Sequence, residues 1–373
     1  MMVVMGGLYL LLQALLVLGW KRYRPPAALG EEVGISVVIC AHDEEENLRR
    51  FLPSVLEQAY GAFEVVVVLD RCGDGSLGVL EEFGERYSAL RVLEVKETQE
   101  GWASKKYALR EGIRAARYSV IALTDADCWV EKDWLKQLRA HLGGDTQLVL
   151  GLGLYYQYGG WLNRFIRYET LYTAFQYVGL AQWGMPYMGV GRNMCYRKSF
   201  FVDTGELGHV KERLSGDDDL LVNAFADGRR TAVMLGEGSE SYSEPKRSWG
   251  GWILQKFRHV SASNAYSWRS KAFLGLFHFS HLLFYIFFGI NLSIFLCDPF
   301  LKDVVCIYVI RIMVSWGLFG MLRRLIRSEE ILIFFPILDF LYFLYNISIV
   351  PLGLIVKPGW QKRNDVGGSP TQA

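Results

Sequence analysis

Two aspartates one residue apart, Asp125 and Asp127, follow a short apolar run in the sequence L-T-D-A-D-C. The run from Ser119 to Leu123 is uncharged and rich in strand-forming residues, so we expect a buried strand there. Side chains two residues apart point to the same side of an extended chain, which brings the two carboxylates together. Carboxylate oxygens are preferred ligands of Mg²⁺ and Mn²⁺, and such an ion could hold a diphosphate. An aspartate-rich turn that caps the next helix is the alternative interpretation.

The aspartate pair belongs to a region of alternating strands and helices, from about residue 34 to about residue 270. Before the pair we expect strands at Ile35–Cys40, Glu64–Leu69 and Leu90–Val95, and helices at Glu45–Gln58, Leu77–Tyr87 and Lys105–Ala116. Because the strands are mainly apolar and do not alternate with polar residues, they predict a mostly parallel α/β sheet with helices on both faces. Ligands bind beyond the carboxyl ends of such strands, where His42, Asp43 and Asp70 also lie.

The composition argues against several classes of protein. The chain has 373 residues, of which 51% are hydrophobic, and its net charge is +1. This balance provides no overall field that would attract a nucleic acid. The six cysteines lack C-x-x-C spacing, which argues against zinc or a disulfide framework and fits a reducing compartment.

The hydrophobic residues are concentrated toward the two ends of the sequence. Val3–Trp20 is uncharged and long enough to approach a bilayer span, and Lys21 follows it at once. A cleavable signal would carry its charge before the apolar run, so we expect an anchor with Lys21 in the cytoplasm. A buried core helix is the alternative. Three further spans are expected at Gly275–Cys297, Val304–Leu322 and Ile331–Val356.

The charges that flank these spans do not give one consistent orientation. Arg323, Arg324 and Arg327 place the end of the second C-terminal span in the cytoplasm, in agreement with the anchor. A third span would then put Lys357, Lys362 and Arg363 on the outer side. Either the last segment is re-entrant or interfacial, or the tail breaks the positive-inside rule.

Two opposite charges, Arg311 and Asp339, lie within the last two expected spans. A lone charge in hydrocarbon is costly, so we expect these side chains to form a salt bridge. Their depths from the cytoplasmic side, roughly 16 Å and 12 Å at 1.5 Å per residue, are compatible. A transporter could use such charges, but four spans are few and the soluble insert is large.

Several polar motifs follow one another along the soluble region. They are S-V-V-I-C-A-H-D-E-E-E-N-L, V-V-V-V-L-D-R-C-G-D-G-S, G-W-A-S-K-K-Y-A-L-R-E-G-I, T-D-A-D-C, P-Y-M-G-V-G-R-N-M-C-Y-R-K, S-G-D-D-D-L-L and Q-K-F-R-H. In order and spacing they resemble the inverting family-2 glycosyltransferases of the GT-A fold, in their membrane-anchored branch. The resemblance implies a divalent metal, Mg²⁺ or Mn²⁺, and a nucleoside-diphosphate sugar as donor.

The resemblance also implies roles for individual residues. Asp70 would bind the base of the nucleotide, Asp125 the ribose and Asp127 the metal on the diphosphate. Asp217, Asp218 and Asp219 would supply the catalytic base, and we prefer Asp218 because G-D-D-x-x-L overlays G-E-D-x-x-L. Donor contacts are also expected from Ala41, Asp43, Glu45, Lys105, Lys106, Gln255 and Arg258, and acceptor or sugar contacts from Gly189, Gly191, Arg192, Asn193 and His259.

The chemistry of sugar transfer fits these residue types. Stabilising the charge on a leaving diphosphate is the largest task, which suits a metal on Asp127 and the guanidinium of Arg258. An acceptor hydroxyl must lose a proton, and a carboxylate within a like-charged cluster can have a raised pKa. The alternative for Asp217 to Asp219 is a helix N-cap. His259 replaces the tryptophan of Q-x-x-R-W, which argues against polymer synthesis.

Residues 246–272 are rich in aromatic and basic side chains and predict amphipathic helices in the headgroup layer. We therefore expect an anchor at 1–24, a GT-A domain at 34–245, interface helices at 246–272, transmembrane helices at 273–356 and a polar tail at 357–373. The predicted function is transfer of a single sugar to a lipid or other membrane-embedded acceptor, at the inner membrane with the catalytic domain in the cytoplasm. A processive polysaccharide synthase and a catalytically silent assembly partner are the alternatives.

Overall fold

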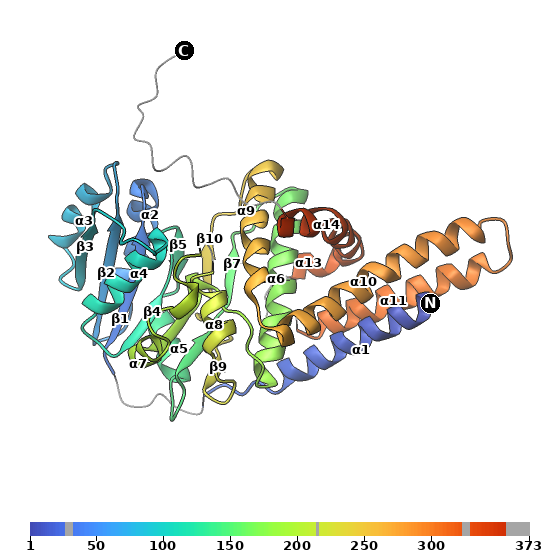
Figure 1. Ribbon diagram of the computed structural model, residues 1–373, viewed down its shortest axis with the longest axis horizontal. Coiled ribbons are helices and arrows are strands. Elements are labelled where there is room, and N and C mark those ends of the chain that lie inside the picture. The colour runs from blue at the N-terminus through green and yellow to red at the C-terminus, as the bar shows by residue number, and fades with distance from the viewer. Residues whose placement is uncertain (27–32, 214–215, 323–328, 356–373) are drawn as a thin grey trace, which may run out of the picture.

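The computed structural model describes residues 1–26, 33–213, 216–322 and 329–355 (Figure 1). Some predictions fall outside these ranges. They concern the arginines Arg323, Arg324 and Arg327, the basic residues Lys357, Lys362 and Arg363, and the tail at 357–373.

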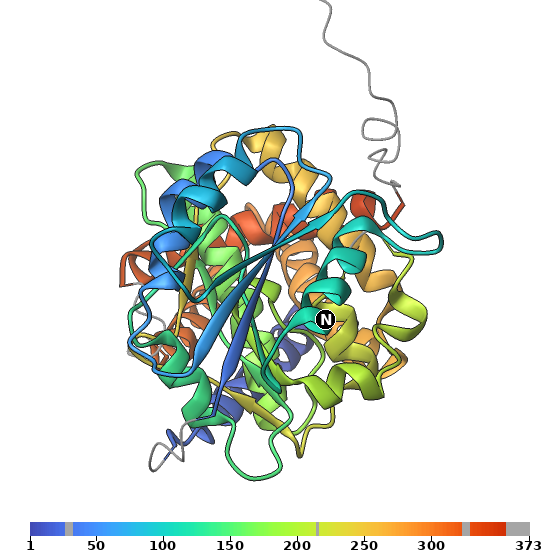
Figure 2. The ribbon, with the colours of Figure 1, turned by 90° about the vertical axis from the view of Figure 1, so that its left-hand side faces the viewer.

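Within the described ranges, seven strands form the main sheet in the order β3-β2-β1-β4-β8-β6-β9. They are β1 Ile35–Ala41, β2 Phe63–Asp70, β3 Leu90–Val95, β4 Val120–Leu123, β6 Leu148–Leu150, β8 Met194–Arg197 and β9 Thr231–Val233. β1 pairs in parallel with β2 and β4, whereas β8 is antiparallel to β4 and β6. The sheet is therefore mixed and mostly parallel, and Figure 2 views it from the side that carries β2, β3 and α3.

A second, smaller sheet has the order β5-β10-β7 and contains β5 Cys128–Val130, β7 Gly153–Tyr155 and β10 Ser241–Ser243. The helices of the soluble part are α2 Glu45–Leu56, α3 Ser76–Gly84, α4 Ser104–Ala115, α5 Trp134–His141, α6 Trp161–Gln182, α7 Lys198–Asp203, α8 Asp219–Phe225 and α9 Trp249–Ala262. The more apolar helices are α1 Met2–Lys21, α10 Trp268–Ile294, α11 Leu301–Gly320 and α14 Phe335–Ile355, with the short α13 Glu329–Ile333 before the last.

Alternate side chains of each central strand enter different cores. In β1, Val37 and Ile39 pack in one cluster with Leu48 of α2, whereas Val38 packs in the other with Leu109 of α4. Because both faces of the strand are buried, its sequence is apolar at every position but Ser36. The α/β architecture with helices on both faces is confirmed, and the predicted strands and helices before the aspartate pair match the observed ones to within three residues.

The second core extends beyond the sheet, through α6, to the apolar helices. One cluster of buried residues includes Leu109 of α4, Tyr172 of α6, Tyr9 of α1 and Tyr342 of α14. α6 thus joins the main sheet to the helices that are candidates for membrane insertion.

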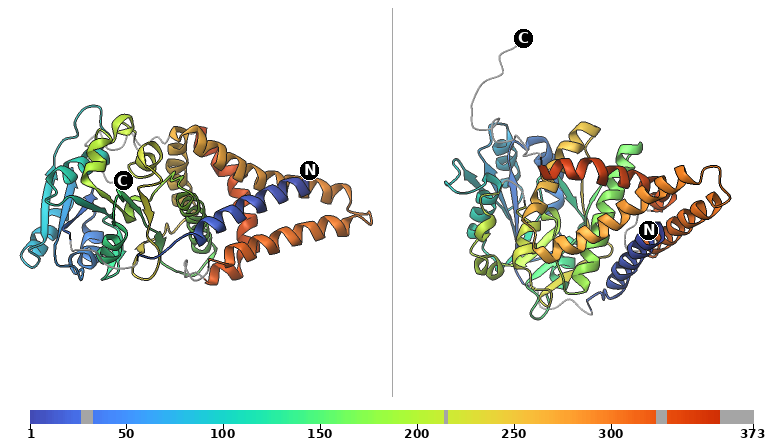
Figure 3. Two further views of the ribbon diagram at one scale, coloured as in Figure 1. Left: turned by 90° about the horizontal axis from the view of Figure 1, so that it is seen from below. Right: turned by 45° about the vertical axis from the view of Figure 1, so that its right-hand side comes forward.

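Among the described residues, four helices are long and apolar enough to cross a membrane: α1, α10, α11 and α14. α1 packs along α10 and α11, and these three helices extend together away from the sheet (Figures 1 and 3). α14 instead runs across their direction and packs against α9 (Figure 3). The last predicted span is therefore divided into α13 and α14, and its longer part does not lie parallel to the others.

The predicted salt bridge between Arg311 and Asp339 is confirmed. Arg311 of α11 donates to the Asp339 carboxylate of α14, and both side chains are almost fully buried. Tyr285 of α10 donates a further hydrogen bond of 2.7 Å to Asp339. The pair therefore ties α14 to α10 and α11.

Candidate active site

The predicted site residues meet beyond the carboxyl ends of β1 and β4, at the start of α4 and α8. Lys105, in the first turn of α4, lies 3.0 Å from a carboxylate oxygen of Asp125 and 3.2 Å from one of Asp217. One ammonium group therefore joins the aspartate pair to the acidic cluster, although the two motifs are separated by about ninety residues of sequence. This contact is what brings the two predicted halves of the site together.

The second aspartate of the pair, Asp127, lies in an environment that disfavours its negative charge. Burial and the neighbouring Asp125 carboxylate raise the pKa of Asp127, while the charge of Arg192 acts in the opposite direction. Ligand atoms of Asp125, Asp127 and Cys128 lie within 4.8 Å of one another. Two hard oxygen donors at this spacing fit a divalent cation such as Mg²⁺ or Mn²⁺. The thiol of Cys128 is a soft ligand, and burial raises its pKa, so the carboxylates are the ones suited to such an ion.

Asp218 is both a helix cap and an accessible carboxylate. It precedes α8, and its two oxygens accept from the backbone N–H groups of Asp219 at 2.7 Å and Gly191 at 2.6 Å. Burial and the charge of Asp217 raise its pKa. The capping interpretation and the catalytic one are therefore compatible, because the residue is half-buried rather than enclosed.

The neighbours of Asp218 have different environments. Burial by itself raises the pKa of Asp217, but Lys105 reverses this and the net pKa is lowered, so Asp217 is held as the anion. Asp219 is buried and accepts from the Tyr266 hydroxyl at 2.7 Å. Burial and the charge of Asp218 raise the pKa of Asp219 to about 7. Each of the three carboxylates thus has one dominant partner or role.

Gly191 and Arg192 link the acidic cluster to the small sheet. A Cβ at Gly191 would lie 3.3 Å from the Asp218 carboxylate, so glycine permits this close approach. The next side chain, Arg192, donates to the Gly153 carbonyl at 2.7 Å and lies 4.4 Å from the centre of the Tyr155 ring. Its guanidinium is therefore held beside the aspartate pair by contacts that do not use a carboxylate.

Three predicted contact residues are buried in structural positions instead. Lys106 is 1% exposed and donates to the Val210 carbonyl at 2.7 Å, and burial lowers its pKa to about 8. Asn193 is fully buried, and its amide group donates to two backbone carbonyls. Gly189 is enclosed by side chains of the core. Their present partners belong to the protein itself, and the expected contacts of these three residues with donor or acceptor stay predictions.

Residues after β1 form hydrogen bonds that join the loop after β1 to the loop after β2. Asp43 accepts from the Gly73 N–H at 2.7 Å, and Glu45 accepts from the Gly75 N–H at 3.2 Å. Ala41 is buried at the strand end, and Asp70 at the end of β2 pairs with Arg71 at 2.9 Å. The two loops that follow β1 and β2 are thus fixed at the edge of the sheet where nucleotides bind in this fold class.

The Q-x-x-R motif lies on α9. Gln255 donates to the Tyr155 hydroxyl at 3.4 Å, and Arg258 and His259 are exposed. The charges of Arg192 and Lys105 both act on His259, which places this face of α9 toward the same site.

Sequence reasoning missed Glu44 and the two tyrosines Tyr155 and Tyr266. Burial and the charges of Asp127 and Asp125 raise the pKa of Glu44, so a third carboxylate adjoins the aspartate pair. The run of acidic residues after β1 indicates that one of them could reach the site, but the sequence does not show that this residue is Glu44. The tyrosines act through contacts that only the fold creates.

Comparisons with known proteins agree with this geometry. Residues 36–204 match the family described as glycosyl transferase family 2. YdaM of Bacillus subtilis, a probable glycosyltransferase, is 26% identical over 277 residues, which are 69% of this chain and 64% of that protein. A poly-β-1,6-N-acetyl-D-glucosamine synthase of Staphylococcus epidermidis is 31% identical over 101 residues, 27% of this chain and 23% of that one. The chain thus spans less than two thirds of either relative.

Among solved structures, a mannosyltransferase of Pyrobaculum calidifontis in complex with GDP-Man and Mn²⁺ aligns with a TM-score of 0.56. It is 15% identical, and the alignment covers 93% of this chain and 99% of that one. At this identity the likeness establishes the fold, which is GT-A, and extends over both the soluble part and the apolar helices.

Proposed function

We propose that this chain, a member of glycosyl transferase family 2, moves one sugar from a nucleoside-diphosphate sugar to a lipid or other membrane-embedded acceptor. The observation that carries the proposal is the Lys105 bridge, 3.0 Å from Asp125 and 3.2 Å from Asp217. It joins carboxylates suited to a metal with carboxylates suited to proton transfer at one sheet edge. Such a combination is what transfer of a sugar from a diphosphate requires.

In this proposal Asp218 takes the proton of the acceptor hydroxyl. Its pKa is raised by burial and by Asp217, so its proton affinity is closer to that of the hydroxyl being activated. The two backbone N–H donors fix the carboxylate in orientation, which keeps it in position for the transfer. Asp217 stays ionised beside Lys105 and helps to keep the proton on Asp218 once it has been transferred.

The leaving diphosphate would be held by cations around the aspartate pair. Asp125 and Asp127 would hold Mg²⁺ or Mn²⁺, and a bound divalent cation supplies charge neutralisation for the leaving group. The mannosyltransferase of similar fold was solved with Mn²⁺, which supports this choice. Lys105 and Arg192 add fixed positive charge from the protein, and the exposed guanidinium of Arg258 can donate to phosphate oxygens.

A membrane acceptor is supported by the position of the apolar helices. The active-site helix α9 packs against α14, and its side chains Trp249 and Leu254 remain exposed. Amphipathic helices of this kind lie in the headgroup layer of a bilayer. An acceptor anchored in the membrane would therefore reach Asp218 without leaving the lipid surface.

The direction of α14 offers a solution to the conflict among the flanking charges. If α1, α10 and α11 enter the inner membrane and α14 runs across them without crossing it, Lys21 lies on the cytoplasmic side and the last segment adds no further crossing. The catalytic domain is then cytoplasmic as well. This arrangement is our proposal for the location, and it corresponds to the interfacial alternative for the last segment.

Release of nucleoside diphosphate from UDP- and GDP-sugars, in the presence of Mn²⁺, tests the proposal. Asp127→Ala should abolish release, whereas Asp203→Ala, which removes an exposed carboxylate on α7, should not. Equal rates in wild type and Asp127→Ala would refute the assignment, and no release from any donor would favour a silent assembly partner.

A processive synthase is the second candidate, because the similarity to a polysaccharide synthase covers 27% of the chain. Mass spectrometry of the product decides between the two functions. One added sugar per acceptor supports single transfer, and a ladder of lengths supports polymerisation.

A further inference from the structure

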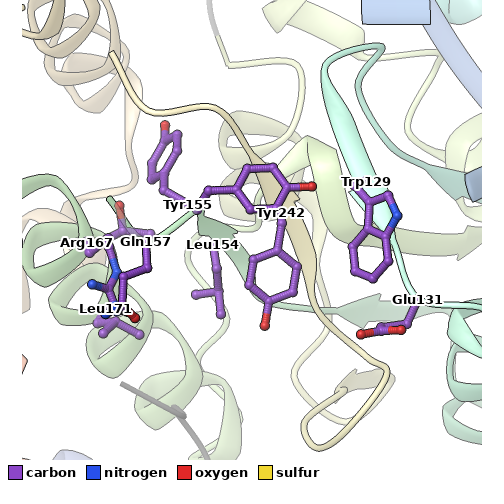
Figure 4. A pocket seen from close by; sticks show the side chains of 10 residues that line it. Trp129, Glu131, Leu154, Tyr155, Gln157, Arg167, Leu171 and Tyr242 are labelled. Carbon is purple, nitrogen blue, oxygen red and sulfur yellow. Dashed lines mark hydrogen bonds between the residues drawn. The ribbon is translucent and has the colours of Figure 1, made fainter. Parts of the chain in front are cut away.

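A cavity of about 320 Å³ opens between the small sheet and α6, beside the aspartate pair (Figure 4). One wall is a strip of aromatic rings. Trp129 of β5 pairs across the sheet with Tyr242 of β10, and their ring centres are 6.1 Å apart. Tyr156, which follows β7, stacks on Tyr242 at 5.9 Å. The strip thus presents rings from three neighbouring chain segments.

Both edges of the cavity carry polar side chains. Glu131 is exposed at one edge, and Gln157 and Arg167 lie at the other (Figure 4). Gln157 donates to Glu330 of α13 at 2.7 Å, and Arg167 of α6 donates to the same carboxylate at 2.9 Å. These contacts fix the edge formed by Gln157 and Arg167 against α13, the helix that precedes α14.

One residue connects the cavity to the proposed catalytic group. Tyr155 lines the cavity, and the guanidinium of Arg192 lies on its ring. Arg192 directly follows Gly191, whose N–H holds the Asp218 carboxylate. A ligand in the cavity would therefore lie next to the segment that positions the base, on the side toward the membrane helices.

We propose that this cavity binds a pyranose ring of the acceptor, so that the acceptor is a lipid that already carries a sugar. The C–H groups on one face of a pyranose pack on aromatic rings, while its hydroxyls need hydrogen-bonding partners at the edges. The cavity offers both, and its volume lies at the small end of the usual range for ligand sites, enough for one or two rings. The term "acceptor" rests on the proposed function, but saccharide binding does not.

A lipid chain is a poorer occupant of the same space. It would cover the exposed Glu131 carboxylate without giving it a hydrogen bond, which is unfavourable. The exposed apolar surface of α10, α11 and α14 already offers places for such chains. The saccharide part of a glycolipid fits the chemistry of the cavity better.

The test measures binding of free sugars to the full chain in a detergent without a sugar headgroup. Saturation-transfer NMR would be recorded with the methyl glycosides of glucose, galactose, mannose and N-acetylglucosamine, at concentrations on the order of 10 mM, suited to millimolar dissociation constants. We expect transfer to the ring C–H protons of at least one glycoside. Its affinity should fall roughly fivefold to tenfold in Trp129→Leu or Tyr242→Leu, which keep an apolar side chain but remove the ring.

Tyr158→Ala is the matched control, because Tyr158 is an exposed tyrosine near the cavity that does not line it. It should bind the glycoside as the wild type does. The inference is overturned if no glycoside of the panel binds, or if the two leucine variants bind as tightly as the wild type. Binding of UDP and GDP in the same samples reports folding and tests the donor site separately. Glycoside binding without nucleotide binding would refute the proposed function but leave the cavity assignment standing.

Discussion

Replacing Asp218 by asparagine tests whether this carboxylate is the base or only a helix cap. Asparagine caps helices about as well as aspartate, so a residue that acts only as a cap should tolerate the change. A general base contributes roughly 10² to 10⁴ to the rate, which corresponds to about 2.7 to 5.5 kcal/mol of barrier at 1.36 kcal/mol per tenfold change. We expect turnover to fall within this range.

The structure also gives a cost in stability that has to be separated from the loss of catalysis. Both oxygens of Asp218 accept backbone N–H groups, from Gly191 at 2.6 Å and from Asp219 at 2.7 Å. Asparagine can keep one of these contacts, but its NH₂ group then faces the other N–H. The loss of one charge-assisted hydrogen bond is worth about 1.5–3 kcal/mol at most, because the site is only partly buried. Asp218→Asn should therefore fold, with a lowered unfolding temperature.

Asp219→Asn is the matched control. It changes the adjacent carboxylate, which is buried and accepts from Tyr266, and so perturbs the same cap without removing the proposed base. Turnover would be measured as nucleoside-diphosphate release in membranes that contain the natural acceptor, together with donor affinity and the unfolding temperature. If Asp218→Asn keeps more than about a tenth of wild-type turnover, the assignment is refuted. If Asp217→Asn shows the larger loss, the base lies one residue earlier.

The remaining predictions concern the metal, the membrane pair, pH and topology. Excess EDTA should abolish donor turnover and Mn²⁺ or Mg²⁺ should restore it, because Asp125 and Asp127 offer only oxygen ligands; full activity in EDTA would contradict this. Removing either Arg311 or Asp339 alone should destabilise the detergent-solubilised protein by about 3–5 kcal/mol, and the double variant Arg311→Met/Asp339→Leu should be destabilised by less. Additive losses in thermal unfolding of the three variants would show that the two side chains are not coupled. Because the folded-state pKa of Asp219 is raised to about 7, stability should fall as pH rises from about 4 to about 7, and Asp219→Asn should flatten that slope in unfolding temperatures measured across pH. A reporter joined after residue 373 should be active only as a cytoplasmic fusion, and an outer-side signal would show that α14 spans the membrane.

The sheet and the aspartate pair were predictable because their signals are local. Buried parallel strands such as β1 and β2 contain an unbroken run of apolar residues in their middle, Val37–Ala41 and Val65–Leu69, so their sequence identifies them without knowledge of their neighbours. The Arg311–Asp339 pair was predictable for a similar reason. Two opposite charges in apolar helices have few other ways to avoid unfavourable burial.

The positions of Lys106 and Asn193 could not be read from the sequence. Lys105 and Lys106 are adjacent and chemically alike, and only the rotation of α4 against the sheet decides which one faces the aspartates. Asn193 occurs in a glycine-containing loop typical of ligand contacts, yet its amide satisfies carbonyls that the fold brings there from residues about forty positions away. Such roles depend on tertiary contacts, which a local pattern does not contain.

The apolar helices are fixed to the catalytic sheet by α6, and this has a consequence for the acceptor. Lys256 of α9 pairs with Glu169 of α6, and Arg164 of α6 pairs with Glu330 of α13 at 2.8 Å. Tyr172 of α6 contacts the hydroxyl of Tyr9 on α1. Because one rigid helix carries all three connections, the position of Asp218 relative to the apolar helices is set by the fold rather than by a flexible linker. If these helices enter a membrane and the acceptor is a lipid, as we propose, its reacting hydroxyl must lie at one fixed distance from the lipid surface.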